Sequence, residues 1–217
     1  IKDYHAKPSN KAYEIMMGAV EPPRLQLIRR LNQTQDATAK LVKMREDLIQ
    51  LLPSHPQLGK LNIDFKHLFA SWFNRGFLVL RPISWSSPAH ILEKVINYES
   101  VQEIENWDDL RRRLQPEDRR CFAFFHPAMP DEPLIFVEVA LTEGTPDSIQ
   151  EILLESRDVT GADRADTAAF YSISNCQAGL AGISFGNFLI KRVAHELQLE
   201  PVSYTHLRAH ETVLDLV

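Results

Sequence analysis

The sequence has little of several features that would assign a chain to a specialised class. It contains two cysteines in 217 residues, Cys121 and Cys176, with no CxxC spacing. This predicts free thiols in a reducing compartment rather than a disulfide framework. No run of about 18 apolar residues occurs, so no membrane-spanning helix is expected. We also find no internal repeat and no low-complexity tract.

An excess of basic charge is missing as well. The formal net charge is −5, whereas a sequence-independent nucleic-acid binder carries a basic face. The arginine runs at 111–113 and 119–120 are interleaved with acidic residues, a pattern typical of a solvated helix face. No nucleic-acid partner is therefore predicted.

The first third of the chain has a helical pattern. From Asn10 to about Arg75, apolar residues recur at spacings of three and four, and prolines mark the starts and breaks. At Gly76 the spacing of the apolar residues changes from the helical period to one typical of strands. Strands are predicted at 77–80, 120–125, 134–141 and 167–174, with helices at 88–98, 106–115 and 148–154 and a hairpin loop at 126–133. We predict an α+β chain in which an all-helical bundle, 1–75, precedes a mixed α/β domain, 76–200.

The most informative stretch runs from Asp166 to Gln198. A strand enters a loop that carries Gly179, Gly182 and Gly186, and the loop leads into an amphipathic helix beginning near Ser184 or Asn187. Glycines let the backbone approach a ligand closely, and the free N–H groups of a helix start attract phosphate. A plain strand-to-helix turn has the same pattern, so the residues alone leave both interpretations open.

The histidines carry weaker signals. His126 lies at a strand end, where a structural role is favoured over acid or base catalysis. His206 and His210 are four apart, a spacing that places two imidazoles on one helix face as zinc ligands. No third ligand lies nearby, so no metal site is predicted.

Three strand residues are also assigned structural roles. Ser172 and Ser174 are two apart and share one face of a strand, where hydrogen bonding is favoured over nucleophilic catalysis because no GxSxG elbow is present. Glu138 alternates with apolar residues, which predicts an exposed strand face. It would be a candidate general base only if it were buried.

Several segments resemble malonyl-CoA decarboxylases: RRCFAFFHPAMPDEPLIFVEVALTEG, SIQEIL, FYSISNCQAGLAGISFGNFLIKRV, SWFNRGFLVLRPISWSSPAHILEKV and NWDDLRRRL. The resemblance implies a helical, homo-oligomer-forming domain joined to a catalytic domain related to the GNAT acetyltransferases. It implies conversion of malonyl-CoA to acetyl-CoA and CO2 in fatty-acid metabolism, without a metal or prosthetic group, since CoA is part of the substrate. The expected compartment is the cytoplasm, and the mitochondrion and the peroxisome are the alternatives.

The resemblance also gives the glycine loop a ligand. The positions that match the family's malonyl-CoA-binding segment are Ala181, Gly182, Ile183, Ser184, Phe185, Gly186 and Asn187. In this assignment the glycines permit close backbone approach to the CoA pyrophosphate, Ser184 and Asn187 donate hydrogen bonds, and the two bulky apolar residues anchor the loop. Backbone N–H groups around Ser174 to Cys176 are expected, by analogy, to stabilise an oxyanion.

The family's catalytic motifs are missing from the chain. The serine motif Ser-Pro-Ile-Pro-Gly-Phe should follow the helix that ends near Gln198, and the histidine motif Asn-Pro-Val-Ala-Asn-Phe-His should come later, yet neither occurs. No catalytic residue is therefore assigned. The last segment, PVSYTHLRAHETVLDLV at 201–217, does not align with the family, and we interpret it as a non-native tail resembling cloning read-through.

Because the chain also begins at Ile1 rather than Met, we expect a fragment with a partial helical domain and a truncated GNAT-like domain. Such a fragment should show no appreciable turnover. Two alternatives remain: a CoA-dependent acyltransferase, which would use the same loop, and a catalytically inert self-association module formed by the helices.

Overall fold

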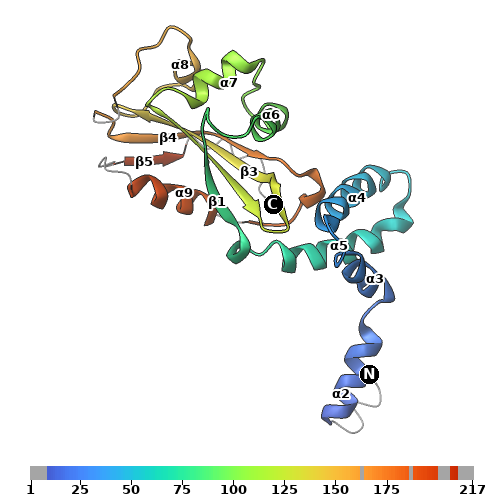
Figure 1. Cartoon of the computed structure of the whole chain (residues 1–217). Helices are drawn as coiled ribbons and strands as arrows, with labels where there is room; N and C mark the ends of the chain where they lie inside the picture. The colour runs from blue at the N-terminus through green and yellow to red at the C-terminus, as the bar shows by residue number, and fades with distance from the viewer. Residues whose placement is uncertain (1–8, 162–163, 186–187, 200–205, 210–217) are drawn as a thin grey trace.

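Helices form the first part of the chain in the computed structural model, which describes residues 9–161, 164–185, 188–199 and 206–209. The helices are α2 (Asn10–Val20), α3 (Pro23–Leu31), α4 (Ala37–Leu51) and α5 (Gly59–Trp72), with a 3-10 turn, η1 (Pro56–Leu58), before α5. Ser9 caps α2 by accepting from the Ala12 N–H at 3.1 Å, and Pro23 opens α3 with its fixed φ. Figure 1 shows α3, α4 and α5 beside one end of a sheet, with α2 projecting away.

A five-stranded sheet forms the rest of the structure. Its strands are β1 (Val79–Ile83), β2 (Arg119–His126), β3 (Met129–Thr142), β4 (Thr167–Asn175) and β5 (His206–Ala209), in that spatial order. The first four are antiparallel, and β5 runs parallel to β4. The connections contain η2 (Arg75–Phe77), α6 (Ala89–Tyr98), α7 (Trp107–Leu114), α8 (Ile149–Leu153), η3 (Ala178–Leu180) and α9 (Phe188–Gln198). The predicted α+β class is confirmed.

Two predicted boundaries are wrong in detail. The strand expected at 77–80 begins at Val79, because the Asn74 side chain caps the 3-10 turn η2 by accepting from the Gly76 N–H at 3.0 Å. The proline-rich hairpin loop is mostly strand, since only Pro127 and Ala128 separate β2 from β3. The pairing of these strands is irregular around Phe125, and such irregular ladders tolerate prolines that lack an N–H.

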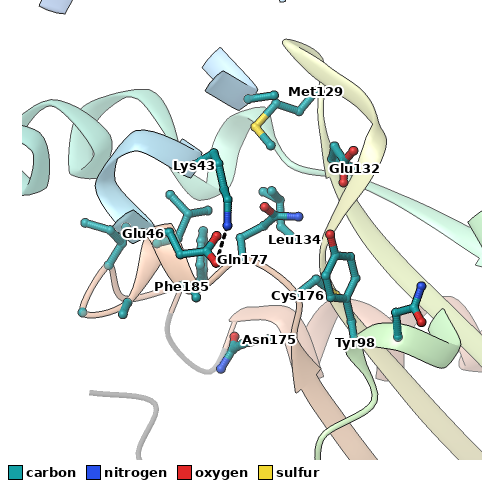
Figure 2. A pocket seen from close by; sticks show the side chains of 17 residues that line it. Lys43, Glu46, Tyr98, Met129, Glu132, Leu134, Asn175, Cys176, Gln177 and Phe185 are labelled. Carbon is teal, nitrogen blue, oxygen red and sulfur yellow. Dashed lines mark hydrogen bonds and ion pairs between the residues drawn. The ribbon is translucent and has the colours of Figure 1, made fainter. Parts of the chain in front are cut away.

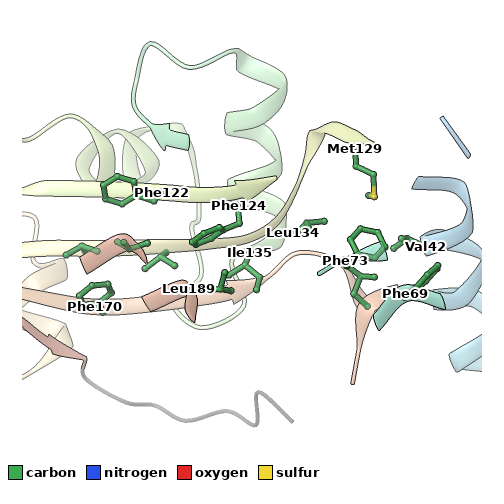
Figure 3. Close-up of a cluster of buried hydrophobic side chains, with 14 of the residues drawn as sticks. Val42, Phe69, Phe73, Phe122, Phe124, Met129, Leu134, Ile135, Phe170 and Leu189 are labelled. Atoms are coloured by element: carbon green, nitrogen blue, oxygen red, sulfur yellow. The ribbon is translucent and has the colours of Figure 1, made fainter. Parts of the chain in front are cut away.

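One hydrophobic core joins the helical segment to the sheet. Phe69 of α5 and Phe73, which follows this helix, belong to the same buried cluster as Phe124 of β2 and Phe170 of β4. Helix α9 closes this side of the sheet through Leu189, which Figure 3 shows, and through Val193 of the same cluster. The change of sequence period near Gly76 therefore does not coincide with a break in the core.

Helices α6 and α7 cover the opposite face of the sheet (Figure 1). The position of Glu138 on this face corrects the expectation of an exposed strand: its side chain is 0% exposed. The Glu138 side chain does point to the opposite face of the strand from the apolar residues that alternate with it, as the sequence pattern indicated. That face is covered by helices and is not exposed to water. Arg113 of α7 faces it, with 3.5 Å between Arg113 Nη1 and Glu138 Oε2.

Candidate functional site

The loop that follows β4 is fixed by backbone hydrogen bonds. Cys176 donates its N–H to the Leu134 carbonyl at 2.9 Å, and Ile183 donates to the Leu180 carbonyl at 2.9 Å. Between these points, Gly182 has φ +71°, in the left-handed region that side chains with a Cβ rarely adopt. The conformation of the loop backbone therefore favours glycine at position 182.

A buried arginine of the helical segment holds the same loop. Arg45 of α4, only 1% exposed, donates from Nη1 to the Gly179 carbonyl at 2.6 Å and from Nη2 to the Ala181 carbonyl at 2.8 Å. Its Nε donates to Asn62 Oδ1 at 3.0 Å. The planar fork of a guanidinium suits two adjacent carbonyls, and it leaves no charged nitrogen of Arg45 without an acceptor.

The loop also packs directly on α4. A Cβ placed on Gly179 would lie 2.0 Å from the Val42 carbonyl oxygen, far inside any permitted contact. Only glycine lets the two backbones approach this closely. Together with Arg45, this contact fixes the loop's position against the helical segment.

A cavity of about 730 Å³ opens on one side of the loop. It lies between α4, the end of α6 and the end of β4, with Lys43, Tyr98, Asn175 and Gln177 among the residues around it (Figure 2). Lys43 pairs with Glu46 at 2.7 Å, so its charge is largely balanced. The hydroxyl and amide groups of the cavity can hydrogen-bond a neutral, amide-containing ligand.

Burial, assisted by a neighbouring negative charge, keeps the Tyr98 hydroxyl protonated. Burial raises the pKa of Tyr98, and the negative charge of Glu132 raises it further. Glu132 itself pairs with Lys94 of α6 at 2.7 Å. Tyr98 therefore offers a hydrogen-bond donor beside the cavity across the physiological pH range.

A second hollow, of about 570 Å³, lies on the other side of the loop. Lys66 and His67 of α5 face Gly182, Ile183 and Ser184 across it. Gly182 and Ile183 line both cavities, so the loop is open to a ligand from the α4 side and from the α5 side.

The structure brings together the described part of the predicted binding segment, residues 181–185. Ile183 and Phe185 are half-buried and pack against the core, as expected for anchors, while Ser184 is exposed. Gly186 and Asn187 lie outside the described residues. The earlier of the two predicted starts of α9 is wrong, because Ser184 and Phe185 are not helical, and the described part of the helix begins at Phe188.

One predicted oxyanion donor is wrong. The Cys176 N–H is already engaged by the Leu134 carbonyl at 2.9 Å, because the chain stays hydrogen-bonded to β3 for one residue beyond β4. It therefore has no free hydrogen for a ligand. Burial also raises the pKa of the Cys176 thiol, which keeps it neutral.

The two strand serines bind a buried carboxylate. Ser172 Oγ donates to Glu99 at 2.8 Å, and Ser174 Oγ donates to Glu99 at 3.1 Å. The backbone N–H groups of Val101 and Gln102 also donate to Glu99, at 2.7 and 2.6 Å. The predicted hydrogen-bonding role of the serines is confirmed, and the network fixes the end of α6 beside the cavity.

His126 also has the predicted structural role. Its Nε2 lies 3.1 Å from the Trp72 carbonyl, and its Nδ1 accepts from the Ala128 N–H at 3.1 Å. These partners select the neutral tautomer that carries hydrogen on Nε2, and burial lowers the pKa of His126. The ring packs 5.0 Å from that of Phe73, so it joins the hairpin to α5.

The described residues contain no group of three or more His, Cys, Asp and Glu side chains placed to hold a metal ion. His206 lies in β5, and His210 lies outside the described residues. Within the same described part, none of the helices is long and apolar enough to cross a membrane.

Sequence reasoning missed Arg45. Its position carried a signal, because Arg45 follows Leu41 by four residues and precedes Leu48 by three, on the buried stripe of α4. A charged residue on an apolar stripe requires buried acceptors. Those acceptors are backbone carbonyls, which no side-chain pattern indicates.

Comparison with known proteins gives matches along nearly the whole chain. The family model "Malonyl-CoA decarboxylase N-terminal domain" matches residues 1–73, and "Malonyl-CoA decarboxylase C-terminal domain" matches residues 76–213. The second match extends into the segment 201–217, whose interpretation as a non-native tail stays a prediction.

Relatives of known structure cover this chain well. The crystal structures of malonyl-CoA decarboxylases from Rhodopseudomonas palustris and Agrobacterium vitis are 56% and 58% identical to it, with TM-scores of 0.86 and 0.84. Each comparison covers 91% of this chain and 48% of the other. The mitochondrial malonyl-CoA decarboxylase of Anser anser anser is 41% identical over 178 residues, 79% of this chain and 35% of its own length. The chain thus spans less than half the length of each of these relatives.

Proposed function

Because the chain belongs to the malonyl-CoA decarboxylase family, we propose that the protein of which it forms a part converts malonyl-CoA to acetyl-CoA and CO2 in fatty-acid metabolism. The observation that carries this proposal is the loop after β4, held by Arg45 and open to a cavity on each side. Such a loop suits a long ligand with a phosphate-rich end and a neutral arm.

In this proposal the segment from Ala181 to Asn187 binds the CoA part of the substrate. The backbone near Gly182 approaches the pyrophosphate, and Ser184 and Asn187 donate hydrogen bonds to it. The pantetheine arm lies in the 730 Å³ cavity, where Tyr98, Asn175 and Gln177 provide partners for its amides.

The reaction requires no metal or prosthetic group in this proposal. Breaking the bond to CO2 leaves an electron pair on the thioester as an enolate, which then takes a proton on carbon. The site must therefore stabilise a negative oxygen and supply a proton. The family's serine and histidine motifs are absent from this sequence, so we propose that the chain binds substrate without completing the reaction.

The experiment combines binding and turnover on the 217-residue chain. We expect calorimetry to detect binding of malonyl-CoA and CoA, and mass spectrometry to detect no acetyl-CoA above the uncatalysed background. Acetyl-CoA formation at the rate of an intact enzyme would contradict the proposal that the chain does not complete the reaction. Absence of CoA binding would contradict the proposal that residues 181–187 bind CoA. Acyl transfer to an amine without release of CO2 would favour the acyltransferase alternative.

We also propose that the helical segment mediates homo-oligomer formation. Several apolar side chains of α2 and α3 are exposed, including Ile15 at 65% and Leu27 at 58%. Exposed apolar side chains on neighbouring helices favour a protein contact. Sedimentation of the chain and of Leu27→Glu tests this, and a monomeric unmodified chain would contradict it.

For the compartment we propose the cytoplasm. The bacterial relatives share more sequence with this chain than the mitochondrial relatives do. A mitochondrial or peroxisomal location would instead be supported by imaging of the tagged protein in its own cells.

A further inference from the structure

One face of α5 is directed at the proposed CoA loop. Ile63, Lys66, His67 and Ala70 follow the spacing i, i+3, i+4, i+7, which places them on one side of a helix. All four line the 570 Å³ hollow together with the loop residues 182–184. The loop therefore faces the side chains on this one face of α5, in the helical segment.

Lys66 is the member of this face that reaches the loop. A Cβ placed on Gly182 would lie 3.0 Å from Lys66 Nζ and 3.3 Å from its Cε. The ammonium group thus lies beside the loop residue with the positive φ, Gly182, which is itself exposed. A ligand that approached the backbone at Gly182 would meet the ammonium group at the same time.

The charge of Lys66 is not balanced by protein groups in the described structure. No carboxylate lines the hollow, and none of the described carboxylates lies within ion-pair distance of Lys66. Lys43, on the other side of the loop, differs because Glu46 and Asp47 lie 2.7 and 3.7 Å from its Nζ. Of these two lysines, Lys66 is the one whose charge remains available to an anion.

A second cation lies at the start of α9. The Arg75 guanidinium is 5.9 Å from the centre of the Phe188 ring, at the first residue of the helix. A helix N-terminus carries a partial positive charge, and a nearby cation adds to it. Two cations, Lys66 of α5 and Arg75 of the turn after it, thus face the loop and the start of α9, whereas the cavity beside α4 contains paired charges.

From this arrangement we propose that Lys66 contacts the pyrophosphate of the CoA substrate, so that the phosphate site combines a cation of the helical segment with the loop backbone at residues 182–184. The inference rests on the proposed function, because it takes CoA as the ligand of the loop. A lysine ammonium serves as a mobile point charge for phosphate, and the contact is a charge-assisted hydrogen bond. Lys66 is a binding residue in this account and takes no part in bond breaking.

The experiment measures binding of three ligands to the 217-residue chain by calorimetry. CoA carries the pyrophosphate and a 3′-phosphate, 3′-dephospho-CoA keeps only the pyrophosphate, and pantetheine has neither. We expect Lys66→Gln to weaken binding of the first two by about 10-fold, the equivalent of one charge-assisted hydrogen bond, and to leave pantetheine unchanged. Lys66→Arg should retain most of the affinity, since it keeps the charge.

Lys60→Gln serves as the matched control, because Lys60 is an exposed lysine of the same helix that does not line the hollow. It should bind all three ligands as the unmodified chain does. Circular dichroism establishes that each variant is folded, and exposed lysine substitutions rarely change stability by more than about 0.5 kcal/mol.

Three outcomes would overturn the inference. Equal CoA affinity in the unmodified chain and Lys66→Gln would exclude the contact while leaving the proposed CoA site intact. A loss seen with CoA but not with 3′-dephospho-CoA would assign Lys66 to the 3′-phosphate instead. If the unmodified chain binds no CoA, the proposed site and this inference both fail.

Discussion

Arg45 donates from Nη1 to the Gly179 carbonyl oxygen at 2.6 Å, although the two residues are 134 positions apart in the chain. A hydrogen bond from a buried guanidinium links α4 to the loop that we assign to CoA. The helical segment therefore has a direct part in the shape of the loop, whatever its role in self-association.

Replacement of Arg45 should destabilise the fold. Arg45→Met leaves the Gly179 and Ala181 carbonyls without their donor, and we expect the free energy of unfolding to fall by about 3 kcal/mol. Arg45→Lys should give an intermediate loss, because an ammonium cannot reproduce the fork. Urea denaturation measures both. Arg30→Met, at an exposed position of α3, is the control, and an equal loss there would contradict a specific role for Arg45.

The close contact between Gly179 and Val42 predicts that a larger residue at position 179 will lower stability. In Gly179→Ala the new methyl would overlap the Val42 carbonyl, so either α4 or the loop must shift. We expect a cost of about 1–3 kcal/mol in stability and weaker CoA binding. Gly59→Ala is the control, since its Cβ would meet nothing within 4 Å. If both variants were as stable as the unmodified chain, the close approach of α4 and the loop would be refuted.

The buried carboxyl of Glu138 should make stability depend on pH. Burial raises the pKa of Glu138 to about 8, the nearby charge of Glu99 adds to this, and Arg113 opposes it. An unfolded glutamate has a pKa of about 4.3. Between these values the folded chain holds a proton that the unfolded chain has lost, so stability falls as the pH rises through this window.

Glu138→Gln tests this directly, since glutamine imitates the protonated carboxyl. We expect the variant to match the unmodified chain near pH 5 and to exceed its stability above pH 8, by an amount on the order of 4 kcal/mol. The measurement is urea denaturation across the pH range. Glu143→Gln, at an exposed position, should leave the profile unchanged. A Glu138→Gln profile parallel to that of the unmodified chain would disprove the raised pKa.

Both thiols should be unreactive in the folded chain. Burial raises the pKa of Cys121 and of Cys176, so neither forms the thiolate that reacts with disulfide reagents. We expect Ellman's reagent at pH 8 to label them at least about 100-fold more slowly in the native chain than in guanidinium. Rapid labelling of one equivalent in the native chain would show that a thiol is accessible.

The sequence patterns predicted local elements better than contacts between distant ones. The strands at 120–125, 134–141 and 167–174 and the helix ending at Tyr98 were predicted from period and turn residues, which depend on near neighbours. Glu138 shows the limit. Its alternation correctly indicated the side of the strand, but only the placement of α6 and α7 decides whether that side is buried.

The candidate site follows the same rule. The glycine loop and its following helix could be recognised from spacing, and the resemblance supplied the ligand. Arg45 and Lys66 could not be assigned to the loop, because α4 and α5 come more than 100 residues earlier and no residue pattern records that they pack there. The kinship with GNAT acetyltransferases and the division into domains at 75 and 200 remain predictions.

The shared core between α5 and the sheet also sets an order of events during synthesis. Phe69 packs in one cluster with Phe170, so the apolar face of α5 leaves the ribosome roughly 100 residues before β4 exists to cover it. At about 5–20 residues per second, that face stays uncovered for roughly 5–20 s. The contacts of the helical segment with this strand can therefore form only once β4 has been synthesised.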